Sequence, residues 1–534
     1  LEFIRTQQRV TFRLIQLFRL IQLFWLFERQ RQQQRRWTQQ QRQFPFQRFF
    51  LGWTPSLERM TGTGEFLHLV RQEKGMFSKF LKSALVCLGI FAVADSRAQE
   101  HVLFWGQELG VGARAVGLGG AYVGVADDYS AVYWNPSGLG QVRRMEFNLG
   151  FSHNSVSNYA NFMGNELEGN ASSSRLNSLG FVFPVPTYRG SLVFGFGYHK
   201  VRDFDNVLDI EGFNPQYAAF ADIVVPTYDG WVTDVNDSLF QQESILEEGS
   251  RNHYTLSGAI ELQQNLFVGA SLNIIRGKDD YGIHFVESDT KNLYSFFDEA
   301  NKIVSDLDYW QYDRTIGSDF SATNLKLGVM YNPVKALRIG ATMTTNTEYE
   351  IKENWGEAWS EYYDTAEEAA VYDYKSNYTY KVKEPFAMGV GMSYRLANAM
   401  LAASVDYQNW NEAKFLSDPP VASVSQAEIN RYIRQELTST TSVHLGGEMY
   451  LPMIKARLRG GYFNQPSPYK NKERHPSRNF YSGGVSLMMD KQVMLDLAYV
   501  TGGWKQESSD DLTYATTLED KDFSKLIGTL IIRF

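Results

Sequence analysis

The residue types that could perform chemistry are scattered along this chain and form no recognisable catalytic motif. The eight histidines lack the short, regular spacing of metal ligands, and no motif marks a Ser-His-Asp set. Gly110, Gly112 and Ala115 imitate a dinucleotide fingerprint, but that motif needs a preceding strand and a following helix in a βαβ unit. The residues therefore predict no enzyme, no cofactor and no metal site.

One set of four basic residues suggests a binding function. Each lies in a segment where apolar and polar residues alternate, at a position expected to face the interior: Lys326, Arg338, Arg457 and Arg459. Guanidinium groups bind carboxylates through paired hydrogen bonds, so Arg338 and Arg457 are candidate contacts for an anionic headgroup. A competing interpretation pairs these cations with acidic residues of neighbouring segments, namely Glu261, Glu448 and Asp496. The pattern leaves both interpretations open.

The elements that would position these residues are segments in which apolar and small or polar residues alternate. In 192–199, for example, Phe194 and Phe196 alternate with Gly195 and Gly197. Side chains on a strand point to opposite faces with a period of two. A soluble sandwich also alternates, but here charges stay off the apolar face, where one Lys or Arg would cost about 2–4 kcal/mol at the bilayer midplane. The pattern favours membrane-spanning strands.

Fourteen such segments are predicted between residue 145 and the end of the chain: 145–156, 175–186, 191–202, 252–263, 265–277, 321–332, 336–351, 376–396, 399–411, 439–451, 454–465, 477–489, 492–505 and 522–534. The joints alternate between short and long, and 157–174 is the first of the long ones. An even strand number with alternating turn lengths is typical of outer-membrane barrels, so 145–534 is predicted to form an all-β, antiparallel, closed barrel with helical extracellular loops.

The two ends of the chain carry signals of their own. Residues 76–98 predict a secretory signal peptide, with a basic start, an apolar stretch and small residues at a cleavage site. Cys87, the only cysteine, lies inside it, so no disulfide is expected. Residues 1–75, rich in Gln, Arg and Phe, are interpreted as disordered, non-native upstream translation; a basic amphipathic helix is the alternative.

At the other end, Phe534 follows apolar residues at every second position, including Leu530 and Ile532. This ending resembles the assembly signal of bacterial outer-membrane barrels. It implies the barrel-assembly machinery and outer-membrane lipid as partners and the cell outer membrane of a diderm bacterium as the location. Acidic residues are concentrated in the long joints, for example Glu243, Glu247 and Glu248, and such an acidic outer rim argues against nucleic acid, which needs basic patches.

A glycine-rich stretch, 99–144, precedes the first strand and is predicted to fold as a hatch inside the lumen, where close backbone approach favours glycine. The hatch residues singled out are Gly117, Gly119, Gly120, Asp127, Asp128, Asn135, Pro136 and Gly138. The run from Gly117 through Asp127-Asp128 to Asn135-Pro136-Ser137-Gly138 resembles the N-terminal hatch of the FadL-type outer-membrane transport family. Ser137 stands where that family usually has Ala.

The resemblance implies a fourteen-stranded barrel with a hatch that takes up fatty acids and other hydrophobic small molecules passively. Uptake would proceed through extracellular capture, hatch rearrangement and lateral exit. A PorV-like branch of the family has the same hatch pattern and serves type IX protein secretion. The alternative function is therefore binding of cargo or secretion-system proteins.

Apolar residues in two long joints are the candidate ligand-binding surfaces: Phe213, Phe220 and Trp231 in 213–231, and Phe296 and Phe297 in 293–307. The second joint has helical spacing, which predicts an apolar helical stripe. Exposed apolar patches often mark binding sites, although these residues would equally pack the loops into a cap. Gly195 and Gly197 predict a strand kink that opens a sideways exit, or else make room for the hatch.

Overall fold

The computed structural model describes residues 108–215, 217–219, 239–292, 295–297, 303–363, 370–420, 424–472 and 474–534. The predicted upstream segment, the signal peptide, Phe220 and Trp231 lie outside these residues. For 295–297 only the backbone is described, so the side chains of Phe296 and Phe297 lie outside as well.

Nearly all of the described chain is β-structure. The strands are β1 (Glu146–Phe162), β2 (Asn165–Val185), β3 (Leu192–Asp203), β4 (Asn206–Asn214), β5 (Leu239–Gln263), β6 (Leu266–Ser288), β7 (Ser295–Phe297), β8 (Ile303–Val334), β9 (Leu337–Thr344), β10 (Thr347–Tyr363), β11 (Ala370–Glu384), β12 (Ala387–Leu396), β13 (Ala399–Asn409), β14 (Lys414–Phe415), β15 (Ser439–Leu451), β16 (Ala456–Gln465), β17 (Arg478–Met488), β18 (Val493–Ser508) and β19 (Thr517–Arg533).

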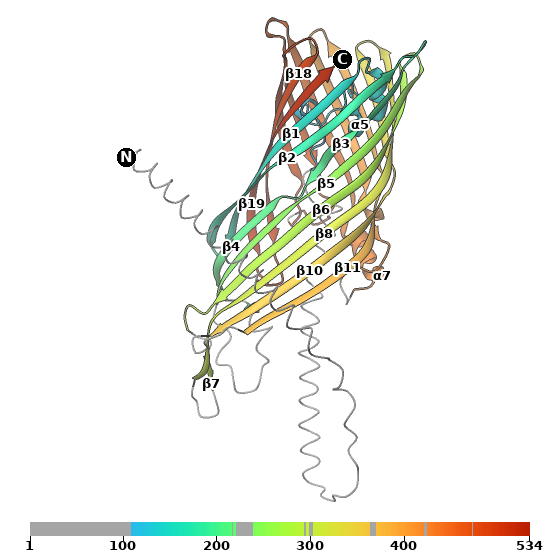
Figure 1. The fold of residues 1–534 in the computed structure, drawn as a ribbon. Coiled ribbons are helices and arrows are strands. Elements are labelled where there is room, and N and C mark those ends of the chain that lie inside the picture. Colours follow the sequence, from blue (N-terminus) through green and yellow to red (C-terminus); the bar gives the residue numbers. More distant parts are fainter. Residues whose placement is uncertain are drawn as a thin grey trace, which may run out of the picture. The chain divides into compact units, whose positions relative to one another are not determined.

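These strands close into a barrel with fourteen positions, as predicted (Figure 1). Three positions consist of two strands in line, β3 with β4, β9 with β10 and β11 with β12, while β7 and β14 are short additions outside the ring. The pairings are antiparallel, and β1 pairs with both β2 and β19, so no edge remains in the ring. Closure satisfies the backbone groups that lipid cannot.

The predicted alternation sets the inside and the outside of the wall. Gly195 and Gly197 face the lumen, whereas Phe194 and Phe196 point outward and are exposed. Outward apolar side chains recur around the ring: Phe151, Leu179, Leu256, Leu272, Leu325, Leu327, Val329, Ile339, Met343, Met388, Val390, Met392, Leu401, Val405, Val443, Leu445, Leu458 and Leu526. An outward apolar band is the surface that lipid requires.

The two ends of the barrel differ, and we call them the turn end and the loop end. All six predicted short joints lie at the turn end, together with Phe534, whose backbone nitrogen donates to the Met145 carbonyl at 3.0 Å. The prediction of a long joint at 157–174 is wrong, because β1 and β2 continue to a tight hairpin at Met163 and Gly164. Both turn residues have positive φ.

Strands toward the loop end are longer than predicted. β5, β6 and β8 have 25, 23 and 32 residues, whereas a tilted strand crosses a bilayer with about 9–11. Beyond that length polar residues take outward positions, so the apolar alternation fades although pairing continues. The described parts of 293–307 are extended and not helical as predicted, because β7 pairs with the start of β8 and this pairing outweighs the local helical spacing.

Helices are few within the described residues. The hatch holds α4 (Ala113–Gly117), α5 (Ala131–Trp134) and the 3-10 helix η2 (Pro136–Gln141). At the loop end, α7 (Gln426–Glu436) begins with a capping box between Ser425 and Glu428, which satisfies two orphan backbone donors. Two further 3-10 turns are η3 (Trp410–Glu412) and η4 (Pro452–Ile454). Of these described helices, none is long and apolar enough to cross a membrane.

Candidate functional site

The hatch fills the part of the lumen nearer the turn end (Figure 1). From Leu109 to Gly140 its residues are buried, apart from Asp127 and Tyr133, which are half-buried. Its apolar side chains, such as Leu118, Val125 and Leu139, pack with inward residues of the wall in one hydrophobic cluster. The hatch is therefore a packed plug rather than a loose tail.

Glycines of the wall create the space for this plug. A Cβ added to any of the following would collide with hatch atoms or press closely on them: Gly180, Gly195, Gly197, Gly269, Gly328, Gly340, Gly391, Gly446 and Gly461. For example, a Cβ at Gly269 would stand 2.5 Å from the Pro136 carbonyl carbon. We call these nine residues the glycine girdle. They lie on eight different strands, so the hatch fits the wall closely around most of the ring.

Side chains of the wall also donate hydrogen bonds to hatch carbonyls. The Ser393 hydroxyl donates to the Gly124 carbonyl at 2.8 Å, the Ser271 hydroxyl to the Val132 carbonyl at 2.8 Å, and the Ser191 hydroxyl to the Gly140 carbonyl at 2.7 Å. In the other direction, the Ala113 and Gly119 amides donate to Thr529 and Ser482, each at 3.1 Å. These bonds satisfy backbone groups that burial would otherwise leave without water.

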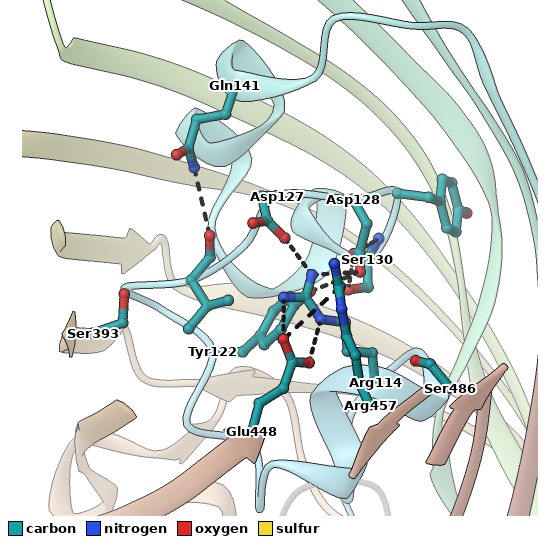
Figure 2. Close-up of polar contacts among 12 residues, drawn as sticks. Arg114, Tyr122, Asp127, Asp128, Ser130, Gln141, Ser393, Glu448, Arg457 and Ser486 are labelled. Atoms are coloured by element: carbon teal, nitrogen blue, oxygen red, sulfur yellow. Dashed lines mark hydrogen bonds and ion pairs between the residues drawn. The ribbon is translucent and has the colours of Figure 1, made fainter. Parts of the chain in front are cut away.

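Arg114 on α4 is the centre of a buried ion network (Figure 2). Its guanidinium Nε lies 3.0 Å from Glu448 Oε2 on β15, and Nη1 pairs with Asp127 of the hatch. Glu448 in turn accepts from Arg459 at 2.8 Å, and Asp127 accepts from Arg338 at 3.0 Å. The network ties the hatch to two sides of the wall through charge-assisted bonds.

The charges of this network shift the pKa of Asp127. Burial alone would raise the pKa of this carboxyl, but the guanidinium groups of Arg114 and Arg338 outweigh burial and hold it well below its usual range. Burial would likewise lower the pKa of Arg114, yet Asp127 is the largest of the opposing influences and raises it. Both groups are therefore charged at neutral pH, as an ion-paired anchor requires.

The Asn-Pro motif closes the hatch upon itself. Asn135 is fully buried and caps η2, since its Oδ1 accepts from the Ser137 amide at 3.2 Å and from the Ser137 hydroxyl at 2.6 Å. Its Nδ2 donates to the Val123 carbonyl at 2.9 Å. Pro136 occupies the first position of η2, where a missing amide hydrogen is tolerated. A Cβ at Gly138 would collide with the Ala126 carbonyl.

The other predicted hatch residues also lie inside the plug. Gly119 and Gly120 have φ of 64° and 72°, a region that favours glycine. Gly117 ends α4 against Gly484 of the wall. Asp128 accepts from Tyr122 at 2.6 Å and from the Ser130 amide at 2.9 Å. The whole predicted set is thus brought together in the lumen.

The predicted ligand contacts are not brought together. Arg338 and Arg457 face the ion network, with Arg457 Nη1 3.8 Å from Glu448, which matches the competing interpretation of an internal network. Phe213 lies on β4 near the loop end, 40% exposed, beside Phe240 and beneath the Lys291 ammonium. None of these three side chains lines the cavity that the barrel lumen contains.

The predicted kink at Gly195 and Gly197 is not found, because β3 pairs without interruption to β2 and β5 through both residues. The register shift lies between Lys200 and Arg202, and the strand breaks at Phe204 and Asp205. The two glycines instead accommodate Val132 and Tyr129 of the hatch. The sideways exit proposed for this position therefore has no support in the strand geometry.

A cavity of about 250 Å³ lies in the lumen against the hatch. Hatch residues form one boundary: Glu108, Leu109, Gly119, Gly120, Val123, Tyr133 and Trp134. Polar residues of β3, β5, β6, β8 and β10 line one side, among them Arg202, Arg251, His253, Asn273, Asn324, Lys326 and Thr347. Trp410, Phe463, Pro466 and Pro468 contribute an apolar side. We call this space the lumen cavity.

Several relationships within the site were not predicted from the sequence. Arg114 and Glu448 are 334 positions apart, so no local pattern joins them, although an arginine within a Gly/Ala-rich run was a usable signal. Lys326 lies at an inward-facing position of its segment, but the alternation does not show which inward-facing residues border a cavity. Among the described residues, no group of three or more His, Cys, Asp or Glu is arranged to hold a metal ion.

These features define a closed fourteen-stranded barrel whose lumen is occupied by an N-terminal plug. The chain has the fold of the FadL-type outer-membrane barrels. A FadL homologue of Pseudomonas aeruginosa superposes with a TM-score of 0.52 at 13% identity, over 81% of this chain and 100% of that one. The toluene transporter TodX of P. putida gives 0.51 at 12% identity, over 80% and 99%. No protein-family model and no curated protein matches the sequence.

Proposed function

We propose that this chain is a passive outer-membrane channel that admits small hydrophobic or amphipathic molecules past a lumen hatch. The observation that carries the proposal is the lumen cavity, which is bounded by the hatch on one side and by wall residues of the barrel on the others. A compound in this space touches the hatch directly, so its binding can be coupled to hatch displacement.

The outward apolar band and the closed ring support placement in a membrane. Both matched structures have the same barrel, and one of them is described as a toluene transporter. The cavity volume of about 250 Å³ is slightly below the ~300–1,000 Å³ typical of sites for drug-sized ligands. A compact molecule therefore fits within this partly open space, whereas a long-chain fatty acid would extend beyond it.

The proposal is tested with the purified chain reconstituted in liposomes and in planar bilayers. The intact chain should conduct ions poorly while passing a small ring-bearing solute, because the plug fills the lumen. A variant without residues 108–140 should still form the barrel, conduct ions freely and lose discrimination among solutes. Equal solute flux in liposomes with and without the protein would overturn the proposal.

The PorV-like alternative makes a different prediction. Co-purification of secretion-system or cargo proteins from the native membrane, combined with no solute flux, would favour a partner-binding role. The described residues offer no specific observation in favour of that role.

A further inference from the structure

We propose that the lumen cavity binds a small aromatic carboxylate, with the carboxylate at Lys326 and the ring against the apolar side of the cavity. This inference rests on the proposed channel function and narrows its substrate class from small hydrophobic or amphipathic molecules to ring-bearing organic anions. Four observations lead to it: an ammonium without an ion-pair partner, a buried imidazole without a hydrogen-bond partner, an aromatic wall and a small volume.

Lys326 on β8 borders the cavity and, within the described part of the chain, makes no hydrogen bond or ion pair. The ammonium lies 5.1 Å from the centroid of the Tyr133 ring, and the charges of Asp406 and Glu108 act on it from beyond ion-pair distance. An ammonium has three donors and no acceptor. A ligand that supplies carboxylate oxygens would complete its hydrogen bonding and its charge balance.

The other charged groups around the cavity already have partners. Glu108 Oε2 pairs with Arg202 at 2.5 Å and with Arg251 at 2.9 Å. Arg251 also lies 3.5 Å from Glu384, and Asp406 Oδ2 lies 3.3 Å from His444 Nε2. Lys326 therefore differs from Arg202 and Arg251, because no carboxylate lies within 4 Å of its ammonium and an incoming anion could form the direct ion pair that Asp406 and Glu108 do not.

His253 on β5 supplies an independent second observation. It borders the cavity, is 7% exposed, and neither ring nitrogen has a hydrogen-bond partner. Buried polar atoms in folded proteins are almost always paired. Both nitrogens are shielded from solvent in this conformation, as are those of the neighbouring His199, so a polar ligand group could pair with them once the imidazole turns toward the cavity.

The apolar side of the cavity indicates what the rest of the ligand is. Trp410 and Phe463 line it, and Tyr133 and Trp134 of the hatch add two more rings. Aromatic side chains pack favourably against flat rings in offset or edge-on arrangements. The cavity volume of about 250 Å³ accommodates one ring with one carboxylate.

The test uses the full chain in detergent micelles and calorimetric titration with benzoate, toluene and acetate. Benzoate should bind at least ten-fold more tightly than either toluene or acetate. Lys326→Gln should weaken benzoate binding at least ten-fold and leave toluene unchanged, and Lys326→Arg should restore most of the benzoate affinity. Lys505→Gln is the matched control, because that lysine side chain is 82% exposed and should have no effect.

Heat-modifiable gel mobility checks that each variant still folds as a barrel. Tighter binding of toluene than of benzoate, or benzoate binding that Lys326→Gln leaves unchanged, would overturn the inference. Acetate binding as tight as benzoate would overturn the assignment of a ring. Benzoate flux into liposomes is measured separately: binding without flux contradicts the proposed function alone, and flux independent of Lys326 contradicts the inference alone.

Discussion

Gly461 of β16 and Gly119 of the hatch meet so closely that a Cβ on Gly461 would collide with the Gly119 backbone nitrogen. The neighbouring Gly460 points to the other face of the strand, and a Cβ there would have its nearest neighbour at 4.0 Å. Two adjacent glycines therefore differ completely in what a methyl group would meet. The hatch is held by shape as well as by charge.

Gly461→Ala should displace the hatch and raise the ionic conductance of the barrel. The added methyl meets backbone rather than a mobile side chain, and overpacking of this kind typically costs about 1–3 kcal/mol. Planar-bilayer recordings measure the effect, and Gly460→Ala is the matched control. Equal conductance of the two variants would show that the girdle does not set the position of the hatch.

Arg114→Met should loosen the hatch without preventing barrel formation. The substitution leaves Asp127 and Glu448 without their shared partner, and removal of one member of a buried ion pair commonly costs about 3–5 kcal/mol. Limited digestion of the hatch with proteinase K, which does not need a basic residue at the cleavage site, should then become faster. Arg143→Met is the control, because the Arg143 side chain is 57% exposed; similar digestion rates for both variants would contradict the anchoring role.

The strands were predictable because, along a barrel strand, every second side chain points outward and the others point inward from one end to the other. Val390 and Met392 point outward and Gly391 inward, as their alternation in the sequence indicates. The prediction stopped too early at the loop end, where β1 and β2 continue to Met163. Outside the bilayer an outward-facing Asn or Ser contacts water and carries no free-energy penalty. The apolar alternation is therefore lost there, and the sequence no longer distinguishes a strand from a loop.

The site was predictable only where neighbouring residues build it. Asn135 and Ser137 bond to each other two positions apart, so their motif is visible in the chain. The pairing of Arg114 with Glu448, and the position of Lys326 at a cavity, depend on how distant strands curve around the hatch. Such relationships arise from closure of the ring and leave no local pattern.

Hatch anchoring should resist acid until well below neutral pH. The folded pKa of Asp127 is lowered mainly by Arg114 and Arg338 against the opposing effect of burial. Its ion pairs therefore contribute full stability above the unfolded value near ~3.9 and lose it as pH falls through the lower folded value. Conductance should stay flat from about pH 7 to 5 and rise only below about pH 4, by this linkage.

Asp127→Asn should raise conductance already at neutral pH and flatten its acid dependence, because the titrating group is gone. Asp280→Asn, at an exposed carboxylate, should follow the unsubstituted chain. A rise in conductance between pH 7 and 5 in the unsubstituted chain would indicate that some other group, with a higher pKa, controls the hatch.

Asn135→Asp should destabilise the hatch far more than Ser137→Ala, although both change only a few atoms. The aspartate would lose the donor to the Val123 carbonyl, 2.9 Å away, and would place a negative charge at a fully buried position. An uncompensated buried charge costs several kcal/mol, whereas loss of the Ser137 hydroxyl removes one hydrogen bond of about 1 kcal/mol. Hydrogen exchange of the amides in 113–141 measures the difference: protection should collapse in Asn135→Asp and fall only slightly in Ser137→Ala. Equal protection in the two variants would mean that the Asn135 side chain does not hold the hatch together.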